Sequence, residues 1–79
     1  MIAGFEFEDG GRTYTCTVER HETTAADSWW WFGVTADRYR YAPFRATSGD
    51  TRHSVRSRIV AYYSNILARR AMHLPYRPR

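Results

Sequence analysis

Residues 29–35, with the sequence WWWFGVT, constrain the fold of this chain most strongly. In a β-strand, successive side chains point to opposite faces, so Trp29 and Trp31 would lie on one face and Trp30, Phe32 and Val34 on the other. Both faces of such a strand are apolar. A strand of this kind is typically central in its sheet and covered on both sides, here by a helix on one side and by something else on the other.

The segment before this strand predicts a β-hairpin. Residues 4–8 alternate, with Phe5 and Phe7 on one side and Glu6 and Glu8 on the other. Residues 9–11, Asp-Gly-Gly, supply the positive φ angles of a tight turn. Residues 12–20 then form a second strand, with an apolar side and a threonine-rich side.

A fourth strand is predicted after the tryptophans. Residues 21–28 indicate a connecting loop, residues 35–38 a short turn, and residues 39–45 the strand itself. Its alternation places Arg38 and Arg40 on one face and Tyr39, Tyr41 and Arg45 on the other. Because Pro43 has no amide hydrogen for a ladder, this strand lies at an edge or ends there.

The C-terminal region predicts one helix over residues 50–72, with Asp50 as its N-cap and Pro75 beyond its end. Five apolar side chains fall on one arc at helical spacing and should pack on the sheet: Val55, Ile59, Tyr62, Tyr63 and Ile66. Four small residues form a second stripe, Ser57, Ala61, Ser64 and Ala68, which is either a solvated face or a contact with another helix. Residues 73–79 are expected to form a loose basic tail.

Together these patterns predict a single α+β domain over residues 1–79, an antiparallel sheet of three to four strands (residues 2–45, ββββα order) packed on one C-terminal helix. A meander and a rearranged strand order fit the pattern equally well. A core of this size is thin, and small domains often depend on disulfides, metals or self-association. The single cysteine, Cys16, excludes an internal disulfide and is expected to be a buried apolar residue.

The charges of the chain are divided unevenly along it. Residues 1–37 carry two arginines and seven acidic residues, whereas residues 38–79 carry ten arginines and one acidic residue. The second half therefore favours an anionic partner, of which a nucleic-acid backbone is the usual example. The absence of lysine also fits the codon usage of a GC-rich genome. The apolar runs are too short to cross a bilayer, and we expect a cytoplasmic protein without a membrane span.

Catalysis is not indicated. Serine, histidine and acidic residues occur outside any nucleophile elbow, phosphate loop or zinc-binding frame. The three histidines, His21, His53 and His73, are scattered, and Glu6 and Glu8 fit ordinary exposed acids of an edge strand. We expect no catalytic residues, metal, cofactor or small-molecule substrate.

The leading hypothesis is a small nucleic-acid-binding protein that prefers single strands. One helix can cover only one face of the sheet, and rings beside arginines on the other face suit the stacking of unpaired bases and contacts to phosphates. The expected contacts are Trp29, Trp31, Arg38, Arg40, Tyr41 and Arg45. The main alternative is a protein-protein association module, a homodimer or a subunit of a larger complex, that buries the same tryptophan face. Peripheral attachment to a membrane is a third possibility, which the helix disfavours because its apolar arc is needed for the core.

Overall fold

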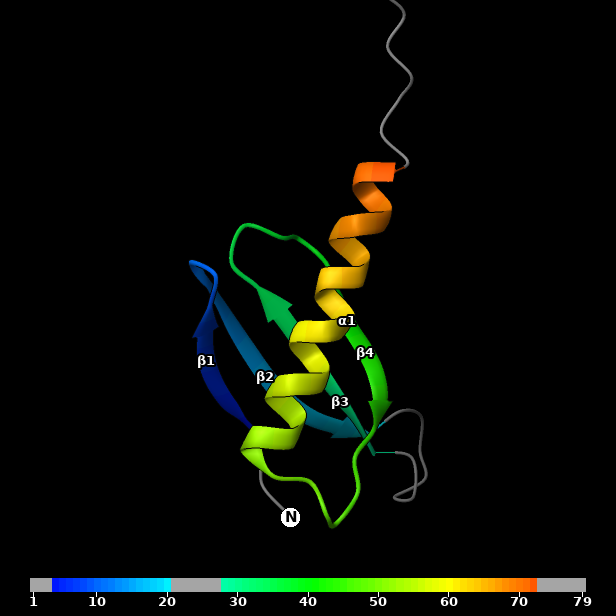
Figure 1. The fold of residues 1–79 in the computed structure, drawn as a ribbon. Coiled ribbons are helices and arrows are strands. Elements are labelled where there is room, and N and C mark those ends of the chain that lie inside the picture. Colours follow the sequence, from blue (N-terminus) through cyan, green and yellow to red (C-terminus); the bar gives the residue numbers. More distant parts are fainter. Residues whose placement is uncertain (1–3, 21–27, 73–79) are drawn as a thin grey trace, which may run out of the picture.

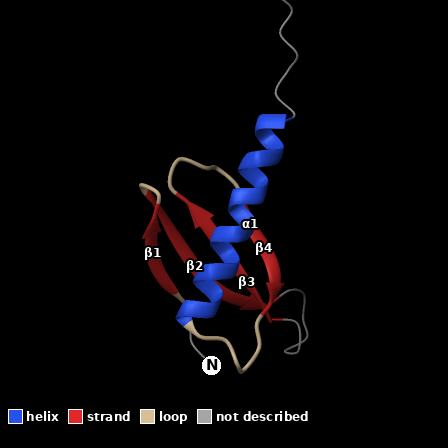
Figure 2. Ribbon diagram, in the orientation of Figure 1, coloured by secondary structure: helices blue, strands red, loops and turns tan. Residues whose placement is uncertain are grey.

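The computed structural model describes residues 4–20 and 28–72. The elements in chain order are β1 (Phe5–Asp9), β2 (Arg12–Arg20), β3 (Ser28–Val34), β4 (Arg40–Arg45) and α1 (Arg52–Met72). The strands form one antiparallel sheet in the order β1-β2-β3-β4, and α1 crosses one face of it (Figures 1 and 2). The predicted α+β fold is confirmed, and the open question of strand order resolves to a meander. Of the predicted loop at 21–28, residues 21–27 lie outside the described residues, and Ser28 is the first residue of β3 instead. The tail at 73–79 and the first residues of the predicted sheet also lie outside the described residues.

The hairpin between β1 and β2 closes as its turn residues predict. Gly10 and Gly11 have φ angles of 59° and 79°, a region that residues with a side chain rarely adopt. Asp9 and Arg12 form the closing pair of the ladder. The turn therefore fixes the register that brings Phe5 and Phe7 to the same face as the apolar side of β2.

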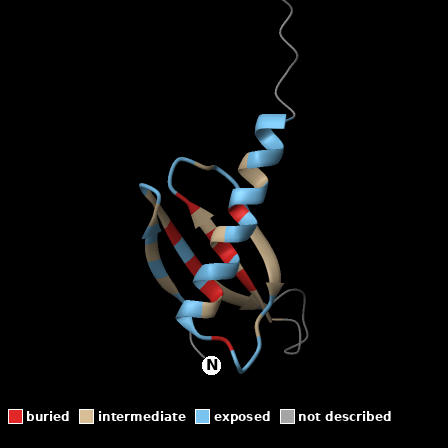
Figure 3. Cartoon of the chain, in the orientation of Figure 1, coloured by how far each residue is buried: buried red, intermediate tan, exposed pale blue. Residues whose placement is uncertain are grey.

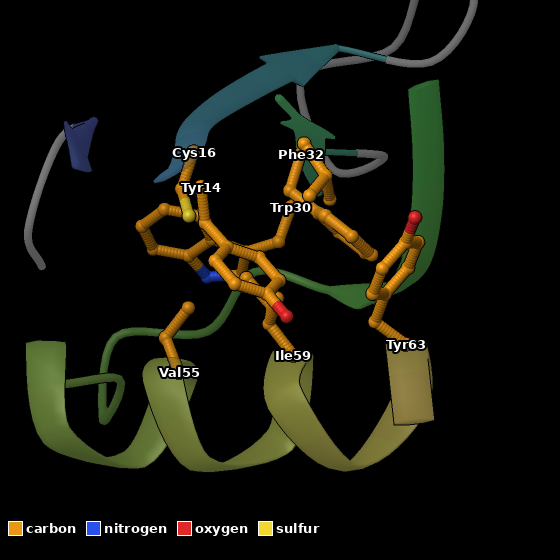
Figure 4. Packing of buried hydrophobic residues seen from close by; sticks show 8 residues of the cluster. Tyr14, Cys16, Trp30, Phe32, Val55, Ile59 and Tyr63 are labelled. Atoms are coloured by element: carbon orange, nitrogen blue, oxygen red, sulfur yellow. The ribbon is translucent and has the colours of Figure 1, made fainter. Parts of the chain in front are cut away.

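The buried residues lie where the sheet and α1 face each other (Figure 3), and many of them are aromatic (Figure 4). The buried residues on the sheet side are Tyr14, Cys16, Trp30, Phe32 and Val34, and those on α1 are Val55, Ile59 and Tyr63. Burial of each large apolar side chain contributes about 1.5–3 kcal/mol. The apolar arc predicted for the helix is confirmed, although Tyr62 lies at its flank and stays 39% exposed. The small-residue stripe is exposed along its whole length.

The start of α1 differs from the prediction. Thr51, not Asp50, is the N-cap: its hydroxyl accepts the amide hydrogen of Ser54, and the Ser54 hydroxyl accepts that of Thr51. Asp50 instead turns inward, where it is buried and accepts the indole N–H of Trp30 at 2.7 Å and the amide of Thr47 at 2.8 Å. Burial alone would raise the pKa of Asp50, but these hydrogen bonds outweigh it and the pKa is lowered. The prediction failed because a buried indole donor requires an acceptor, and Asp50 is placed to supply it.

A second buried carboxylate, Asp37, joins the loop between β3 and β4 to the helix. Its Oδ2 accepts the phenol hydrogens of Tyr41 and Tyr63, each at 2.8 Å, and its Oδ1 accepts the amide of Tyr39 at 3.0 Å. The guanidinium of Arg70 lies 3.4 Å from the same carboxylate. Three parts of the chain thus meet at one charge: the loop, β4 and α1.

No helix among residues 4–20 and 28–72 is long and apolar enough to cross a membrane. Cys16 is buried as expected, and burial raises the pKa of its thiol to about 12.

Candidate nucleic-acid interface

The face of the sheet that α1 does not cover is called the open face here. In the register of the ladders, its side chains alternate with those of the core. It consists of Glu6 and Glu8 on β1, Thr13, Thr15, Thr17 and Glu19 on β2, Trp29, Trp31 and Gly33 on β3, and Arg40 and Arg45 on β4. Glu6 and Glu8 lie on β1, Glu19 lies on β2 beside β3, and the arginines lie on β4. An anionic chain would therefore be attracted to the β3–β4 side of the face.

Two arginine–tryptophan pairs stand next to each other on the open face. The guanidinium carbon of Arg40 lies 4.9 Å from the ring centroid of Trp31, and that of Arg45 lies 5.9 Å from the ring centroid of Trp29. Both distances are within the range of cation–π attraction. Both indoles are half-buried, in contrast to the fully buried Trp30 between them in sequence. The face thus presents flat cationic groups lying over aromatic rings.

An irregularity in the β3–β4 ladder makes this arrangement possible. Arg40 and Arg45 are five residues apart, so a regular strand would point them to opposite faces, as the sequence predicted. In the structure Arg40 pairs with Gly33 and Arg45 with Trp29, and the register shifts between Trp30 and Phe32. The extra residue in β4 reverses the alternation, and both arginines reach the same face. The prediction for Arg45 was wrong because such a shift leaves no signature in the alternation pattern.

Arg40 is also held by an acidic residue of the open face. Its Nη2 lies 2.5 Å from Oε2 of Glu19, which also accepts the hydroxyl of Thr17 at 2.9 Å. The hydrogen bond from Arg40, followed by that from Thr17, lowers the pKa of Glu19. Since both partners are about half exposed, this ion pair is of the weak surface kind. A phosphate could compete with Glu19 for the same guanidinium.

Arg38 and Tyr39 lie in the loop that precedes β4, not in the strand itself. Tyr39 is 58% exposed, and Arg38 is exposed and forms no ion pair with any residue between 4 and 20 or between 28 and 72. Both line a shallow pocket of about 270 Å³ at the end of the open face. Thr13, Thr15, Gly33 and Arg40 also line it, so the pocket is continuous with the arginine–tryptophan pairs.

Tyr41 does not belong to this site. It points to the helix side of the sheet, where its ring lies 5.3 Å from that of Phe32 and its hydroxyl donates to Asp37. Burial, followed by its bond to Asp37, raises the pKa of this phenol. Of the six residues predicted as contacts, the structure therefore brings Trp29, Trp31, Arg40 and Arg45 together on the open face, with Arg38 beside them in the loop, and places Tyr41 in the core.

The indole nitrogen of Trp31 is buried and has no hydrogen-bond partner within the described parts of the chain. An unsatisfied buried donor costs about 1–3 kcal/mol. The guanidinium of Arg40 lies over the same indole ring.

Sequence reasoning missed Gly33 and Tyr39. The signal for Gly33 was present, since one glycine interrupts a strand of bulky residues. Tyr39 was expected inside the fourth strand, on the same face as Tyr41 and Arg45, whereas β4 begins one residue later, at Arg40. In the described residues, no cluster of three or more histidine, cysteine or acidic side chains could hold a metal ion.

Comparison with protein-family models, with curated proteins and with solved structures finds no match for this chain. The chemistry of the open face therefore has to support any functional proposal.

Proposed function

We propose that this protein binds single-stranded nucleic acid along the β3–β4 side of the open face. The observation that carries the proposal is the adjacent placement of the Arg40–Trp31 and Arg45–Trp29 pairs. Unpaired bases stack on aromatic rings and on the planes of arginine guanidinium groups, and each stacked base contributes about 1–3 kcal/mol. The same guanidinium groups donate to phosphate oxygens in a bidentate manner.

The flatness of the site favours an unpaired strand over a duplex. A duplex hides the faces of its bases, and proteins usually read it by inserting a helix or a two-stranded ribbon into the major groove. The open face carries two indoles at alternate positions of one strand, which suits bases splayed from a backbone. The backbone of the ligand would then follow Arg38, Arg40 and Arg45.

The experiment is a fluorescence anisotropy titration with a labelled oligothymidylate of about twelve nucleotides, a length within the usual site size of such proteins. Arg40 is already paired with Glu19, so the expected salt dependence counts only the phosphate that Arg38 contacts. At about 0.7 per phosphate for single strands, affinity should fall at least about threefold between 50 and 200 mM salt. Trp31→Ala should weaken binding about tenfold, the equivalent of one stacked base. Affinity that stays constant over this range of salt would refute the proposal.

Exposed arginine on the other side of the molecule provides a control. Arg52, at the start of α1, lies over Phe5 and not on the open face. Arg52→Ala removes the same charge as Arg38→Ala, so the two variants separate the general attraction of a basic protein from contacts at the site. Arg38→Ala should lower affinity several-fold more than Arg52→Ala, and equal effects would place the phosphate contacts elsewhere.

Association of two copies through the open face is the alternative function, and the half-buried Trp29 and Trp31 favour it. Light scattering with and without the oligonucleotide distinguishes the two. The proposal predicts that the protein without ligand has the mass of one chain, 9.3 kDa, and gains the mass of the oligonucleotide. A stable dimer that does not bind the oligonucleotide would favour association.

A further inference from the structure

Gly33 lies in β3 at a position where the backbone gives no reason for glycine. Gly10 and Gly11 need their positive φ angles, but Gly33 is not among the residues with positive φ. A Cβ added at Gly33 would meet only Cγ of Arg40, at 3.9 Å, which is an ordinary contact. Glycine inside a strand weakens it, and it often marks a bulge or a place where a ligand or another backbone approaches closely. The register shift of this ladder lies between Trp30 and Phe32, whereas Gly33 is paired with Arg40. The space above Gly33 is therefore open to a ligand.

That space is the pocket at the end of the open face. Its volume is about 270 Å³, below the range of about 300–1,000 Å³ typical of sites that enclose drug-sized ligands. Thr13 and Thr15 from β2 line it beside Gly33. The hydroxyl of Thr15 donates to Glu6 at 3.2 Å, so this side chain already has a hydrogen-bond partner. The pocket suits a small flat group better than an extended ligand.

The lining of the pocket includes one aromatic residue, Tyr39, and two cations, Arg38 and Arg40. Tyr39 is 58% exposed, and its backbone is fixed by the bond from its amide to Oδ1 of Asp37. Arg38 adjoins it in sequence. Asp37 also lines the pocket, but its carboxylate is 6% exposed and is engaged by Tyr39, Tyr41 and Tyr63. Its charge is therefore turned toward the core and opposes an anionic ligand less than an exposed carboxylate would.

We propose that this pocket seats one unpaired base of the bound strand, which lies over Gly33 and stacks on Tyr39, while Arg38 contacts the adjoining phosphate. The inference rests on the proposed function and adds to it a distinct subsite for a single base. The lining of the pocket suits a base in particular, because it offers a glycine floor without a side chain, an exposed ring and a cation. The arginine–tryptophan pairs then bind the neighbouring nucleotides.

The test uses the same oligothymidylate with variants that alter the pocket only. Gly33→Val fills the floor and should weaken binding about tenfold without changing the dependence on salt, since no phosphate contact is removed. Tyr39→Ala should weaken binding about tenfold, whereas Tyr39→Phe, which keeps the ring, should stay within about twofold of the native protein. Tyr62→Ala is the matched control, because Tyr62 is an exposed tyrosine on the helix side of the sheet. It should leave the affinity within about twofold.

The outcomes separate this inference from the proposed function. If the native protein binds with the expected salt dependence but Gly33→Val and Tyr39→Ala bind equally well, the subsite is refuted and the proposed function stands. If the native protein does not bind the oligonucleotide, the proposed function fails. A second measurement, an NMR titration with thymidine monophosphate, then judges the pocket alone: shifts of the Gly33 and Tyr39 amides support a nucleotide pocket, and unchanged amides refute it. Circular dichroism verifies that each variant is folded.

Discussion

Asp37 gives the clearest quantitative test of how this small domain is held together, through the replacement Asp37→Asn. Burial would raise the pKa of the carboxyl group, but the amide of Tyr39, the phenols of Tyr63 and Tyr41 and the charge of Arg70 together lower it from 3.8 to about 2. A group with a lowered pKa in the folded state stabilises the protein above its ordinary pKa. This stability is lost as the pH falls from about 4 to about 2.

The size of the effect follows from the two pKa values. At 1.36 kcal/mol for each pH unit, a pKa lowered from 3.8 to about 2 corresponds to about 2 kcal/mol of unfolding free energy at neutral pH. Asparagine has a similar shape and retains one oxygen acceptor, but it carries no charge to bind Arg70. We therefore expect Asp37→Asn to lower the unfolding free energy by about 2 kcal/mol at pH 7, a large fraction of the stability of a domain of this size.

The assay is urea denaturation followed by tryptophan fluorescence, at about pH 7, 4 and 2. The difference between the native protein and Asp37→Asn should shrink as the pH falls, because protonation removes the same charge from the native protein. Asp9→Asn is the control: Asp9 lies 3.6 Å from Arg56, both side chains are about half exposed, and its replacement should cost less than about 1 kcal/mol. A difference for Asp37→Asn that is the same at all three pH values would refute the electrostatic account.

Three further predictions concern other parts of the molecule. Glu19→Gln should release Arg40 for one more phosphate contact and enlarge the fall in oligonucleotide affinity between 50 and 200 mM salt by a further factor of about three; an unchanged salt dependence would show that Arg40 does not contact phosphate. Ala36→Gly should raise the unfolding free energy by up to about 1 kcal/mol, because Ala36 has a φ of 70° that glycine adopts more readily, and a lower midpoint in urea would contradict this. Cys16, which is 1% exposed with a pKa raised to about 12, should react with a thiol reagent only after unfolding; rapid reaction in native buffer would show that β2 opens.

The fold could be predicted from the sequence because its local signals agree with one another. Alternation gives the hairpin one apolar face, and the Asp-Gly-Gly turn fixes its register. The helical spacing of Val55, Ile59 and Tyr63 gives the helix a matching apolar arc, and one helix can cover only one face of the sheet. Strand order stayed open because antiparallel pairing of β3 with β4 is compatible with more than one arrangement of the hairpin. The ladders of the structure show the order β1-β2-β3-β4, which is a meander.

The site could be predicted only in part. Simple alternation placed Trp29 and Trp31 on the face opposite Trp30 and Phe32, and the structure agrees, with Trp30 and Phe32 in the core. Arg45 and Tyr41 were assigned to one side together, and the shift in the ladder separates them: one joins the tryptophans and the other enters the core. Asp50 was read as a helix cap because local propensity favours it there, but the need of the Trp30 indole for an acceptor prevailed. Long-range partners of this kind are not visible in a local pattern.

The most direct test of the central claim is an NMR titration of the labelled protein with oligothymidylate. If unpaired nucleic acid lies on the open face, the backbone amide signals of Trp29, Trp31 and Gly33 and the indole signals of the two tryptophans should shift. The backbone amide signals of Val55 and Ile59 in α1 should remain in place. Shifts confined to α1, or none at all at millimolar ligand, would contradict the claim.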